Sequence, residues 1–477
     1  MAFSSLEFLF LFFPVVFGIY YLLPKGIKNY FILAASLFFY AWGNIQSLSV
    51  LIISFLLNYV LILGMAEFKS GSKGRKWLLA FVITLNVGIL FFYKYWDFMM
   101  EVLKPLLPVQ SNTNQNASIA IPIGISFFTF KSISYAVDVY RGTAAAQRNP
   151  LYYGMYISFF PQILSGPIGR YPLMEQKLLD RNVTFTAFSQ GLMRFVLGFN
   201  KKILLADILS NLVKITFTTR ANSVGMAWLG AICYTLQIYY DFSGYSDMAI
   251  GLAAMLGFDT EENFDYPYSS LTITEFWRRW HISLGSWFRD YVYFPLGGSK
   301  VKSKARLLFN LFAVWLLTGI WHGANWTFII WGLMYGVIIS IEKLLSIPQK
   351  LKAAKPAIRV IYRVVTLLTV VIGWVLFRSD TLAFAFHYMK TMFGLAGQPL
   401  MDGSFQFYLS DYHLYILLGI LFSVPVLKWL GERIPWKKGV VFNTACCIYY
   451  IVEIALFVVS ISCLVVSSHN PFVYFNF

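Results

Sequence analysis

The chain has 477 residues, of which 58% are hydrophobic, 19% aromatic and only 13% charged, and its mean hydropathy is +0.63. A composition this apolar excludes an ordinary soluble protein and predicts an all-α, multi-pass membrane protein in which one membrane domain fills residues 1–477. The net charge of +16 does not indicate a nucleic-acid-binding protein, because the Lys and Arg residues form short clusters between apolar runs.

The apolar runs predict about ten to twelve transmembrane helices, since a helix needs about 20 apolar residues to cross the hydrocarbon. The first run, Leu6 to Leu23, lacks a basic leader and a cleavage site, so we interpret it as a retained helix. We group the helices as N-terminal (1–145), core (146–345) and C-terminal (346–477). The later helices are expected over residues 30–45, 47–67, 77–97, 119–140, 307–321, 326–345, 364–377, 412–427 and 441–467.

Basic clusters set the expected orientation, because Lys and Arg beside membrane helices resist translocation and mark cytoplasmic loops. Because successive helices cross the membrane in opposite directions, these clusters predict that both termini lie outside the cytoplasm. The uncharged segment 109–118 and the mixed segment 378–411 are predicted to be exterior. The clusters assigned to the cytoplasm lie at 25–28, 69–76, 141–148, 299–306, 350–363 and 428–438.

The segment 159-FFPQILSGPIGRYP-172 interrupts the regular pattern in the core. Its three prolines would break a simple spanning helix. Irregular backbone at membrane depth persists only where protein or water satisfies its polar groups. We therefore predict a broken or re-entrant element here, with an ordinary cytoplasmic loop as the alternative.

Two acidic residues, Asp241 and Asp247, follow within an otherwise apolar helix. With no lysine nearby in sequence, carboxylates at this depth need a wet cavity, an arginine or a metal. No H-E-x-x-H motif accompanies them, and the four cysteines show no metal-ligand spacing, so we predict no metal site. We expect these acids to pair with the arginines of the next segment.

That next segment, 271–299, is too charged to span lipid and too aromatic to be a free loop. We predict one or two helices in the inner interface, with His281 among their aromatic residues. Arg278, Arg279 and Arg289 are candidates for binding an anionic ligand such as the phosphates of a coenzyme. The alternative is that these arginines only anchor the segment in the interface.

A second histidine, His322, lies in the apolar stretch 319-GIWHGANW-326. At 1.5 Å per residue it falls roughly 24 Å along the helix from Arg306, which places it inside the membrane. An ionisable residue at this depth is a functional candidate, and Gly319 would allow another backbone segment to approach closely. The alternative is a neutral histidine that only links two helices by hydrogen bonds.

Four motifs together resemble the membrane-bound O-acyltransferase (MBOAT) family, in particular its bacterial branch of alginate O-acetylation and teichoic acid D-alanylation proteins. They are YYDFSGYSDMAIG at 239–251, NFDYPY at 263–268, FWRRWHISLGSWFRDYVYFPLGG at 276–298 and WHGANW at 321–326. The resemblance covers most of the chain. It implies a ring of membrane helices around a central tunnel, in a bacterial inner membrane.

The resemblance also implies acyl transfer, with His322 as the catalytic histidine and His281 as the second important position. A neutral imidazole can remove the hydroxyl proton as the ester bond forms, so we expect His322 to be the general base. Asn325 would orient the ring or stabilise an oxyanion, and Asp241 and Trp321 would support the site. We expect no bound cofactor, with acetyl-CoA as the acyl donor.

The expected product is an O-acetylated exported or cell-wall polysaccharide. The chain has no G-x-S-x-G motif, so we expect a partner acyltransferase or a small acceptor protein outside the membrane. The alternatives are D-alanyl transfer from a carrier protein, a polysaccharide or lipid transporter, and a noncatalytic scaffold. His387, His413 and His469 are expected to be surface or structural residues.

Overall fold

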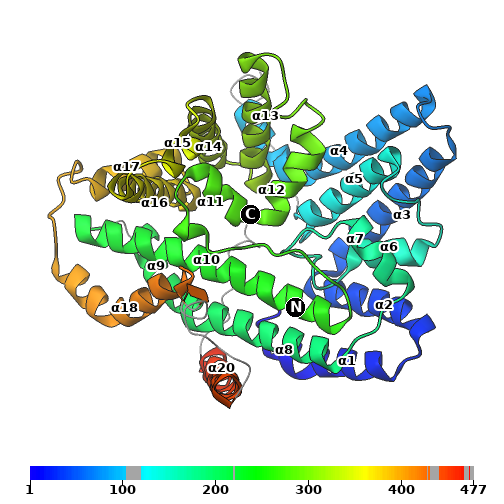
Figure 1. The fold of residues 1–477 in the computed structure, drawn as a ribbon, viewed down its shortest axis with the longest axis horizontal. Helices are drawn as coiled ribbons and strands as arrows, with labels where there is room; N and C mark the ends of the chain where they lie inside the picture. The colour runs from blue at the N-terminus through cyan, green and yellow to red at the C-terminus, as the bar shows by residue number, and fades with distance from the viewer. Residues whose placement is uncertain (104–119, 219–220, 427, 430–439, 467–471, 473–477) are drawn as a thin grey trace, which may run out of the picture. The chain divides into compact units, whose positions relative to one another are not determined.

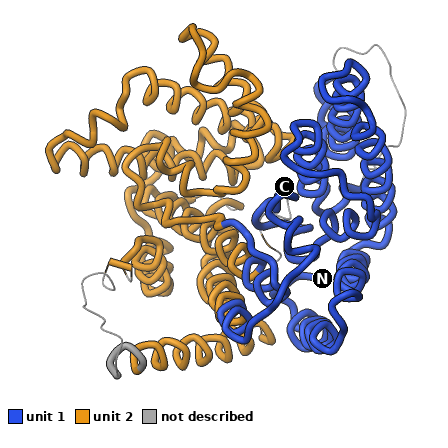
Figure 2. The backbone as a smooth tube through the Cα atoms, turned by 45° about the vertical axis from the view of Figure 1, so that its right-hand side comes forward, with its two compact units in different colours: residues 1–191, 249–261, 474–477 blue, residues 192–248, 262–473 orange. Residues whose placement is uncertain are grey.

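The structure is a computed structural model, and it describes residues 1–103, 120–218, 221–426, 428–429, 440–466 and 472. Figure 1 shows that the regular structure in these residues is helical; their one β-type pairing is an isolated antiparallel bridge between Phe264 and Trp280. The all-α prediction is therefore confirmed. The chain folds as two compact units, coloured separately in Figure 2, and the division falls within α8 and within α10.

The first unit contains residues 1–191 and 249–261. Polar pairs join its helices inside the apolar packing: the Asn58 and Asn86 side chains donate to each other across α3 and α4 at 3.2 and 2.6 Å. Its elements are η1 (Phe8–Phe12), α1 (Phe13–Leu22), α2 (Lys25–Gly43), α3 (Ile45–Glu67), α4 (Lys73–Leu103), α5 (Ile125–Arg141), α6 (Pro150–Ser158), α7 (Tyr171–Leu179) and the start of α8 (Phe185–Asn200).

The segment between α6 and α7 is a buried, non-helical connection, so the predicted break in the backbone is confirmed. Its carbonyl at Ile163 passes so close to Gly124 that a Cβ there would lie 2.3 Å from the oxygen. Gly124 also has φ +75°, a conformation that glycine adopts without steric penalty. Whether the segment re-enters the membrane stays a prediction.

The second unit contains residues 192–248 and most of the chain beyond 262. Beyond the end of α8 its elements follow in chain order, and α10 belongs to this unit up to Met248. They are η3 (Lys201–Asp207), α9 (Ile208–Thr218), α10 (Val224–Met255), η4 (Pro267–Ser269), α11 (Ile273–Arg279), α12 (Ile282–Phe288), η5 (Arg289–Tyr293), α13 (Lys304–His322), α14 (Trp326–Leu344), α15 (Ile347–Lys352), α16 (Pro356–Arg378), α17 (Leu382–Met392), α18 (Gly403–Phe422) and α20 (Val440–Val466).

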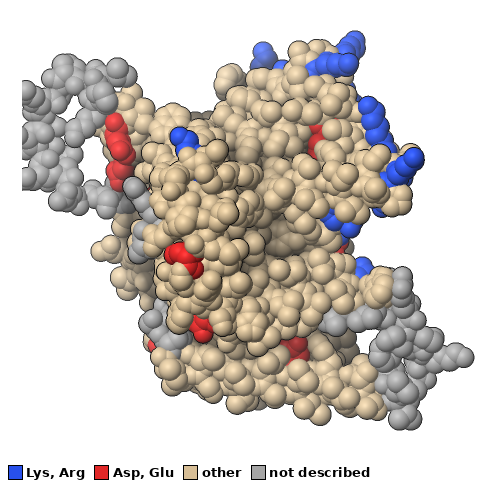
Figure 3. Space-filling view, turned by 90° about the vertical axis from the view of Figure 1, so that its left-hand side faces the viewer, with Lys and Arg blue, Asp and Glu red and all other residues tan. Residues whose placement is uncertain are grey.

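Six helices in the described residues are long and apolar enough to cross a membrane: α3, α4, α13, α14, α16 and residues 444–466 of α20. Figure 3 shows that charged side chains cover little of the surface in view. The chain is therefore a multi-pass membrane protein. The larger number of spans, the orientation of the termini and the single-domain division stay predictions.

Two predicted helix boundaries were wrong. The helix expected over 364–377 begins earlier, at Pro356. The helix expected over 412–427 begins at Gly403 and ends at Phe422. The Asp402 carboxylate accepts a hydrogen bond from the Phe405 amide at 3.1 Å and caps this earlier start. Segment 378–411 therefore contains α17 and the first turns of α18, while the segment 109–118 lies outside the described residues.

Candidate active site

His322 is the last residue of α13, directly before the turn into α14. The two helices pack with their backbones close together. A Cβ on Gly319 would lie 2.6 Å from the Phe328 carbonyl oxygen, and one on Gly332 would lie 2.5 Å from that of Trp315. The close approach predicted at Gly319 is confirmed, and it fixes the helix end that carries His322.

Aromatic rings surround the His322 imidazole, which is only 3% exposed. The ring centroids of Trp321, Trp331 and Phe377 lie 4.8, 4.9 and 5.0 Å from it, and that of Phe328 lies 6.4 Å away. These neighbours come from α13, α14 and α16, so three helices determine the space around this imidazole.

Asn325 caps the following helix. Its Oδ1 accepts from the Thr327 amide at 3.0 Å, and its Nδ2 donates to the Asp380 carbonyl at 2.8 Å. These two bonds join the start of α14 to the end of α16. The structure therefore gives Asn325 a role in holding the turn after His322, and its action on an oxyanion stays a prediction.

His281 lies between the short helices α11 and α12, in the segment where one or two helices were predicted, and the interfacial location of these helices stays a prediction. It is 2% exposed, and its backbone is left-handed at φ 46°, ψ 54°. Its Nδ1 is 3.1 Å from Asn263 Oδ1, and its ring packs edge-on against Phe242 of α10 at 4.6 Å. Burial lowers the pKa of His281 to about 3, so the ring is neutral near pH 7.

Trp321 is the residue whose ring lies near both histidines. Its centroid is 6.1 Å from that of His281 and 4.8 Å from that of His322. The structure therefore brings together three of the residues singled out by the sequence. Asn263, which the sequence reasoning missed as a site residue, lies in the NFDYPY motif, and that motif was the available signal.

The prediction that the arginine-rich segment pairs with Asp241 and Asp247 was wrong. Asp241, 1% exposed, contacts Lys202 at 2.6 Å, and Asp247 contacts Lys201 at 2.7 Å and Arg194 at 3.0 Å. These cations belong to α8 and η3, which pack along α10, where a Cβ on Gly198 would lie 2.4 Å from the Gly244 carbonyl oxygen. Asp241 is therefore part of a buried ion-pair cluster on the helix that packs against His281.

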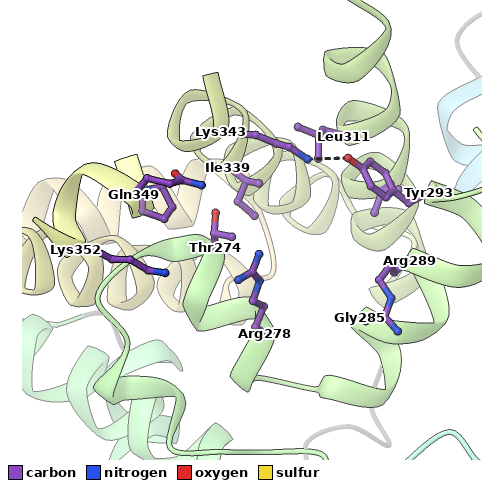
Figure 4. Close-up of a pocket in the computed structure, with 12 residues that line it drawn as sticks. Thr274, Arg278, Gly285, Arg289, Tyr293, Leu311, Ile339, Lys343, Gln349 and Lys352 are labelled. Carbon is purple, nitrogen blue, oxygen red and sulfur yellow. Dashed lines mark hydrogen bonds between the residues drawn. The ribbon is translucent and has the colours of Figure 1, made fainter. Parts of the chain in front are cut away.

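A cavity of about 380 Å³ opens beside this region, and Figure 4 shows the side chains around it. Four of its lining residues are cationic: Arg278, Arg289, Lys343 and Lys352. Among the described residues, only Arg289 of these four has a carboxylate partner, Asp290 at 2.8 Å. Lys343 donates to the Tyr293 hydroxyl at 2.8 Å. The lining consists of Thr274, Arg278, Gly285, Arg289, Tyr293, Leu311, Val314, Ile339, Lys343, Pro348, Gln349 and Lys352.

Two of the three predicted ligand-binding arginines, Arg278 and Arg289, line this cavity, but Arg279 does not. Arg279 instead pairs with Glu275 one helical turn earlier, at 2.8 Å. Successive residues of a helix point about 100° apart, so Arg278 and Arg279 cannot share a face. The lysines Lys343 and Lys352 were missed because they lie 65 and 74 residues after Arg278 in the sequence.

The buried carboxylate of Glu342 holds α11 in place at this cavity. It accepts from the Ile273 and Thr274 amides at 2.9 and 2.8 Å and from the Thr274 hydroxyl at 2.6 Å. A carboxylate at a helix N-terminus satisfies amides that have no partner within the helix. This contact fixes the direction of α11 and hence the position of Arg278.

A cluster of aromatic side chains lies between the cavity wall and His322. Trp277, next to Arg278, packs on Trp315, Tyr335 and Trp331 at 5.0, 5.0 and 5.3 Å, and Trp331 packs on His322. The indole nitrogens of Trp277 and Trp331 and the Tyr335 hydroxyl are buried without hydrogen-bond partners among the described residues. His322 is not a lining residue of the cavity, so this cluster separates the two.

Fold and site define a multi-pass helical membrane protein with a basic cavity beside two buried imidazoles. The chain belongs to the membrane-bound O-acyltransferase family, whose model, MBOAT, matches residues 39–378. It is therefore an O-acyltransferase, as the four motifs predicted, and the transporter and scaffold hypotheses are not retained.

Curated relatives support the same assignment. The chain is 42% identical over 405 residues to a probable alginate O-acetylase, AlgI, of Azotobacter vinelandii, covering 84% of this chain and 80% of the relative. It is 34% identical over 435 residues to the peptidoglycan O-acetyltransferase of Helicobacter pylori, covering 84% and 81%. It is also 33% identical over 233 residues to the teichoic acid D-alanyltransferase of Bacillus subtilis, covering 46% and 58%.

Proposed function

We propose that the chain takes an acetyl group from acetyl-CoA at the cytoplasmic face and delivers it across the membrane for O-acetylation of an exported or cell-wall polysaccharide. The observation that carries the proposal is the cavity with four cationic side chains beside the motif histidines. Relatives named for acetylation of alginate and of peptidoglycan support both the acetyl group and the polysaccharide acceptor.

The cavity suits the phosphates of a coenzyme because cations from three elements converge on it. Arg278 comes from α11, Lys343 from α14 and Lys352 from α15, and none of the three has a described acidic partner. Guanidinium groups bind phosphate through paired hydrogen bonds, and ammonium groups bind it as point charges. The positive-inside tendency of Lys and Arg favours the cytoplasmic side for this surface.

The reaction then needs a base for the acceptor hydroxyl. In the proposed mechanism neutral His322 removes this proton as the hydroxyl oxygen attacks the thioester carbonyl carbon. The carbon–sulfur bond breaks, and the imidazolium returns the proton to the leaving thiolate. No metal is required for this step, and the described residues contain no cluster of three metal-ligating side chains.

Access to His322 requires movement of the aromatic cluster. The imidazole is 3% exposed, and the rings of Trp277, Trp331 and Tyr335 stand between it and the cavity. An arriving donor arm must separate these rings, and their buried donor groups would then meet its amide and thioester carbonyls. A passage for such a molecule is expected to have mostly apolar walls with a few polar groups.

A partner completes the proposed function. The acetyl group passes first to an acceptor on an extracytoplasmic acyltransferase or to a small acceptor protein, which places it on the polymer. Within this scheme the chain supplies the transmembrane transfer, and the partner supplies recognition of the polysaccharide.

The test is transfer of labelled acetyl by the purified chain in liposomes, with acetyl-CoA enclosed on one side and a soluble acceptor alcohol on the other. We expect labelled ester on the acceptor side. A D-alanyl carrier protein as donor is the comparison, and transfer of D-alanine but not of acetyl would replace the proposal with the D-alanylation alternative. Transfer of neither group would contradict both.

A further inference from the structure

We propose that Asn263 is a positioning residue that fixes which nitrogen of His281 carries the proton. Its side-chain oxygen holds the proton on Nδ1, so that Nε2 carries the lone pair and acts as an acceptor. The catalytic consequence rests on the function proposed above, whereas the arrangement of the proton does not.

The backbone of Asn263 is clamped against His281 from both sides. The Ile282 amide donates to the Asn263 carbonyl at 3.0 Å, and the Asp265 amide donates to the Arg279 carbonyl at 3.0 Å. Between these bonds lies the antiparallel bridge of Phe264 and Trp280. The clamp holds His281 in its left-handed conformation, which is sterically unfavourable for a residue other than glycine and which such surrounding contacts must stabilise.

The orientation of the Asn263 amide follows from its neighbours. The Ser283 backbone N–H, which can only donate, faces Asn263 Oδ1 at 3.3 Å, and the Ser283 hydroxyl donates to the same oxygen at 2.9 Å. On the other side Nδ2 donates to Ser246 Oγ of α10 at 3.0 Å. A flipped amide would set its NH₂ group against the Ser283 N–H, so the oxygen must face this side.

The protonation site of His281 is then determined. A neutral imidazole has one N–H and one lone pair, and the nitrogen that faces a carbonyl oxygen must carry the proton. Nδ1 faces Asn263 Oδ1 at 3.1 Å, so it is the N–H nitrogen. Nε2 can therefore accept a hydrogen bond or a proton, but it cannot donate a hydrogen bond to a developing oxyanion.

The charged groups on the packed elements have their own partners, except Arg278 of α11, which lines the basic cavity and has no acidic partner among the described residues. On α10, Asp241 pairs with Lys202, and Asp247 pairs with Lys201 and Arg194. On the other elements, Arg279 of α11 pairs with Glu275 and lies 3.8 Å from Asp265 of the clamp, and Glu262 pairs with Arg194. The titratable group of α13 nearest in sequence to Trp321 is His322. The pKa of His281 is lowered by burial, with no charged group as a cause.

The direct test is solid-state NMR of the ¹⁵N-histidine-labelled protein in lipid bilayers, with the His281 signals identified by their loss in a His281→Gln variant. We expect a protonated Nδ1 and an unprotonated Nε2. In an Asn263→Ala variant the preference should be lost or reversed. Protonation at Nε2 in the unchanged protein, or the same spectrum in Asn263→Ala, would overturn the proposal.

An Asn263→Asp variant keeps the acceptor oxygen and provides a second readout if the alanine variant does not fold. A carboxylate 3–4 Å from the ring would raise the pKa of His281 by about 1–3. The ¹⁵N signals of His281 should then titrate at a pH higher by about 1–3 than in the unchanged protein. The control is Asn44→Asp, which adds the same charge at the half-buried cap of α3 in the other unit and should leave the titration of His281 unchanged.

An unchanged titration of His281 in Asn263→Asp would also contradict the positioning role. The NMR result does not depend on transfer. If the protein moved no acetyl group but showed the expected protonation at Nδ1, the proposed function would fail while the assignment of Asn263 would stand.

Discussion

The surroundings of His281 and His322 differ although both histidines are almost fully buried in the same unit. His281 is held by hydrogen bonds from a clamped loop, beside a helix that carries buried ion pairs. His322 is held by aromatic rings at the end of a tightly packed helical hairpin. Hydrogen bonds fix the location of a proton, whereas ring packing fixes shape and excludes water. The His281 side should therefore respond to changes of charge, and the His322 side to changes of volume.

The largest expected effect is that of His322→Ala on acyl transfer. Loss of a general base lowers a rate by about 10²–10⁴-fold, so transfer should be nearly abolished while the protein still inserts and folds. Labelled-acetyl transfer is the measurement, with His413→Ala as the control because His413 is exposed on α18. Normal transfer by a folded His322→Ala protein would remove His322 from the mechanism.

The next effect concerns charge beside His281. Asp241→Asn removes one of the two carboxylates that contact Lys202, which is 2% exposed, while Asp207 stays at 2.7 Å, so the cost is below the about 3–5 kcal/mol of leaving a buried charge unpaired. A clear fall in the thermal midpoint in detergent is expected. Asp180→Asn is the matched control, since it breaks the exposed pair with Lys25 and should cost at most about 1 kcal/mol. Equal effects of the two variants would argue against this charge sensitivity.

A change of volume tests the hairpin that carries His322. In Gly319→Ala the new Cβ would lie 2.6 Å from the Phe328 carbonyl, so α13 and α14 must separate, at about 1–3 kcal/mol. We expect lower thermal stability together with reduced transfer. Gly18→Ala is the control, because a Cβ there meets nothing within 4 Å. A Gly319→Ala protein as stable as this control would contradict the close packing.

Acid should destabilise the protein partly through His281. Its pKa is about 3 when folded and near 6.5 when unfolded, so between these values only the unfolded chain binds the proton. The contribution of neutral His281 to the free energy of unfolding is fully present above pH 6.5. It falls as the pH is lowered, by about 2 kcal/mol at pH 5. The drop in thermal midpoint from pH 7 to pH 5 should be smaller in His281→Gln. The same drop in both proteins would show that His281 is not buried neutral.

The smallest expected effect is that of a substitution in the basic cavity, which neither histidine lines. Arg278→Ala should raise the KM for acetyl-CoA about tenfold, or about 1.4 kcal/mol, with little change in kcat. The matched control is Arg279→Ala, the neighbouring arginine that does not line the cavity. A larger effect on kcat than on KM would place Arg278 in the chemical step instead of in donor binding.

The helices were predictable where apolar runs had clear ends. The hairpin of α13 and α14 was expected within a few residues because basic residues precede it and Gly323 and Asn325 interrupt it. The start of α18 was misplaced because Asp402 acts as a cap inside a segment that also contains glycine and polar residues. A capping bond depends on the local backbone, which an apolar pattern does not reveal.

The site was predictable as a set of motifs but not as a set of contacts. The histidines and Arg278 stand out as polar residues in aromatic sequence. The partners of Asp241 and His281 do not, because Lys202 and Asn263 lie 39 and 18 residues away and reach them only after helix packing. The left-handed backbone of His281 left no local signal, since a tertiary clamp imposes it.

The π-helical turn η3 places two neighbouring lysines, Lys201 and Lys202, against carboxylates on α10 that are six residues apart in the sequence. A π-helical turn contains one residue more than an α-helical turn. Residues five apart share a face of a π-helix, so Lys202 meets Asp207 of the same element at 2.7 Å, whereas in an α-helix the two side chains would point about 140° apart. The wider turn thus lets one buried ammonium group contact two carboxylates, one on its own element and Asp241 on α10.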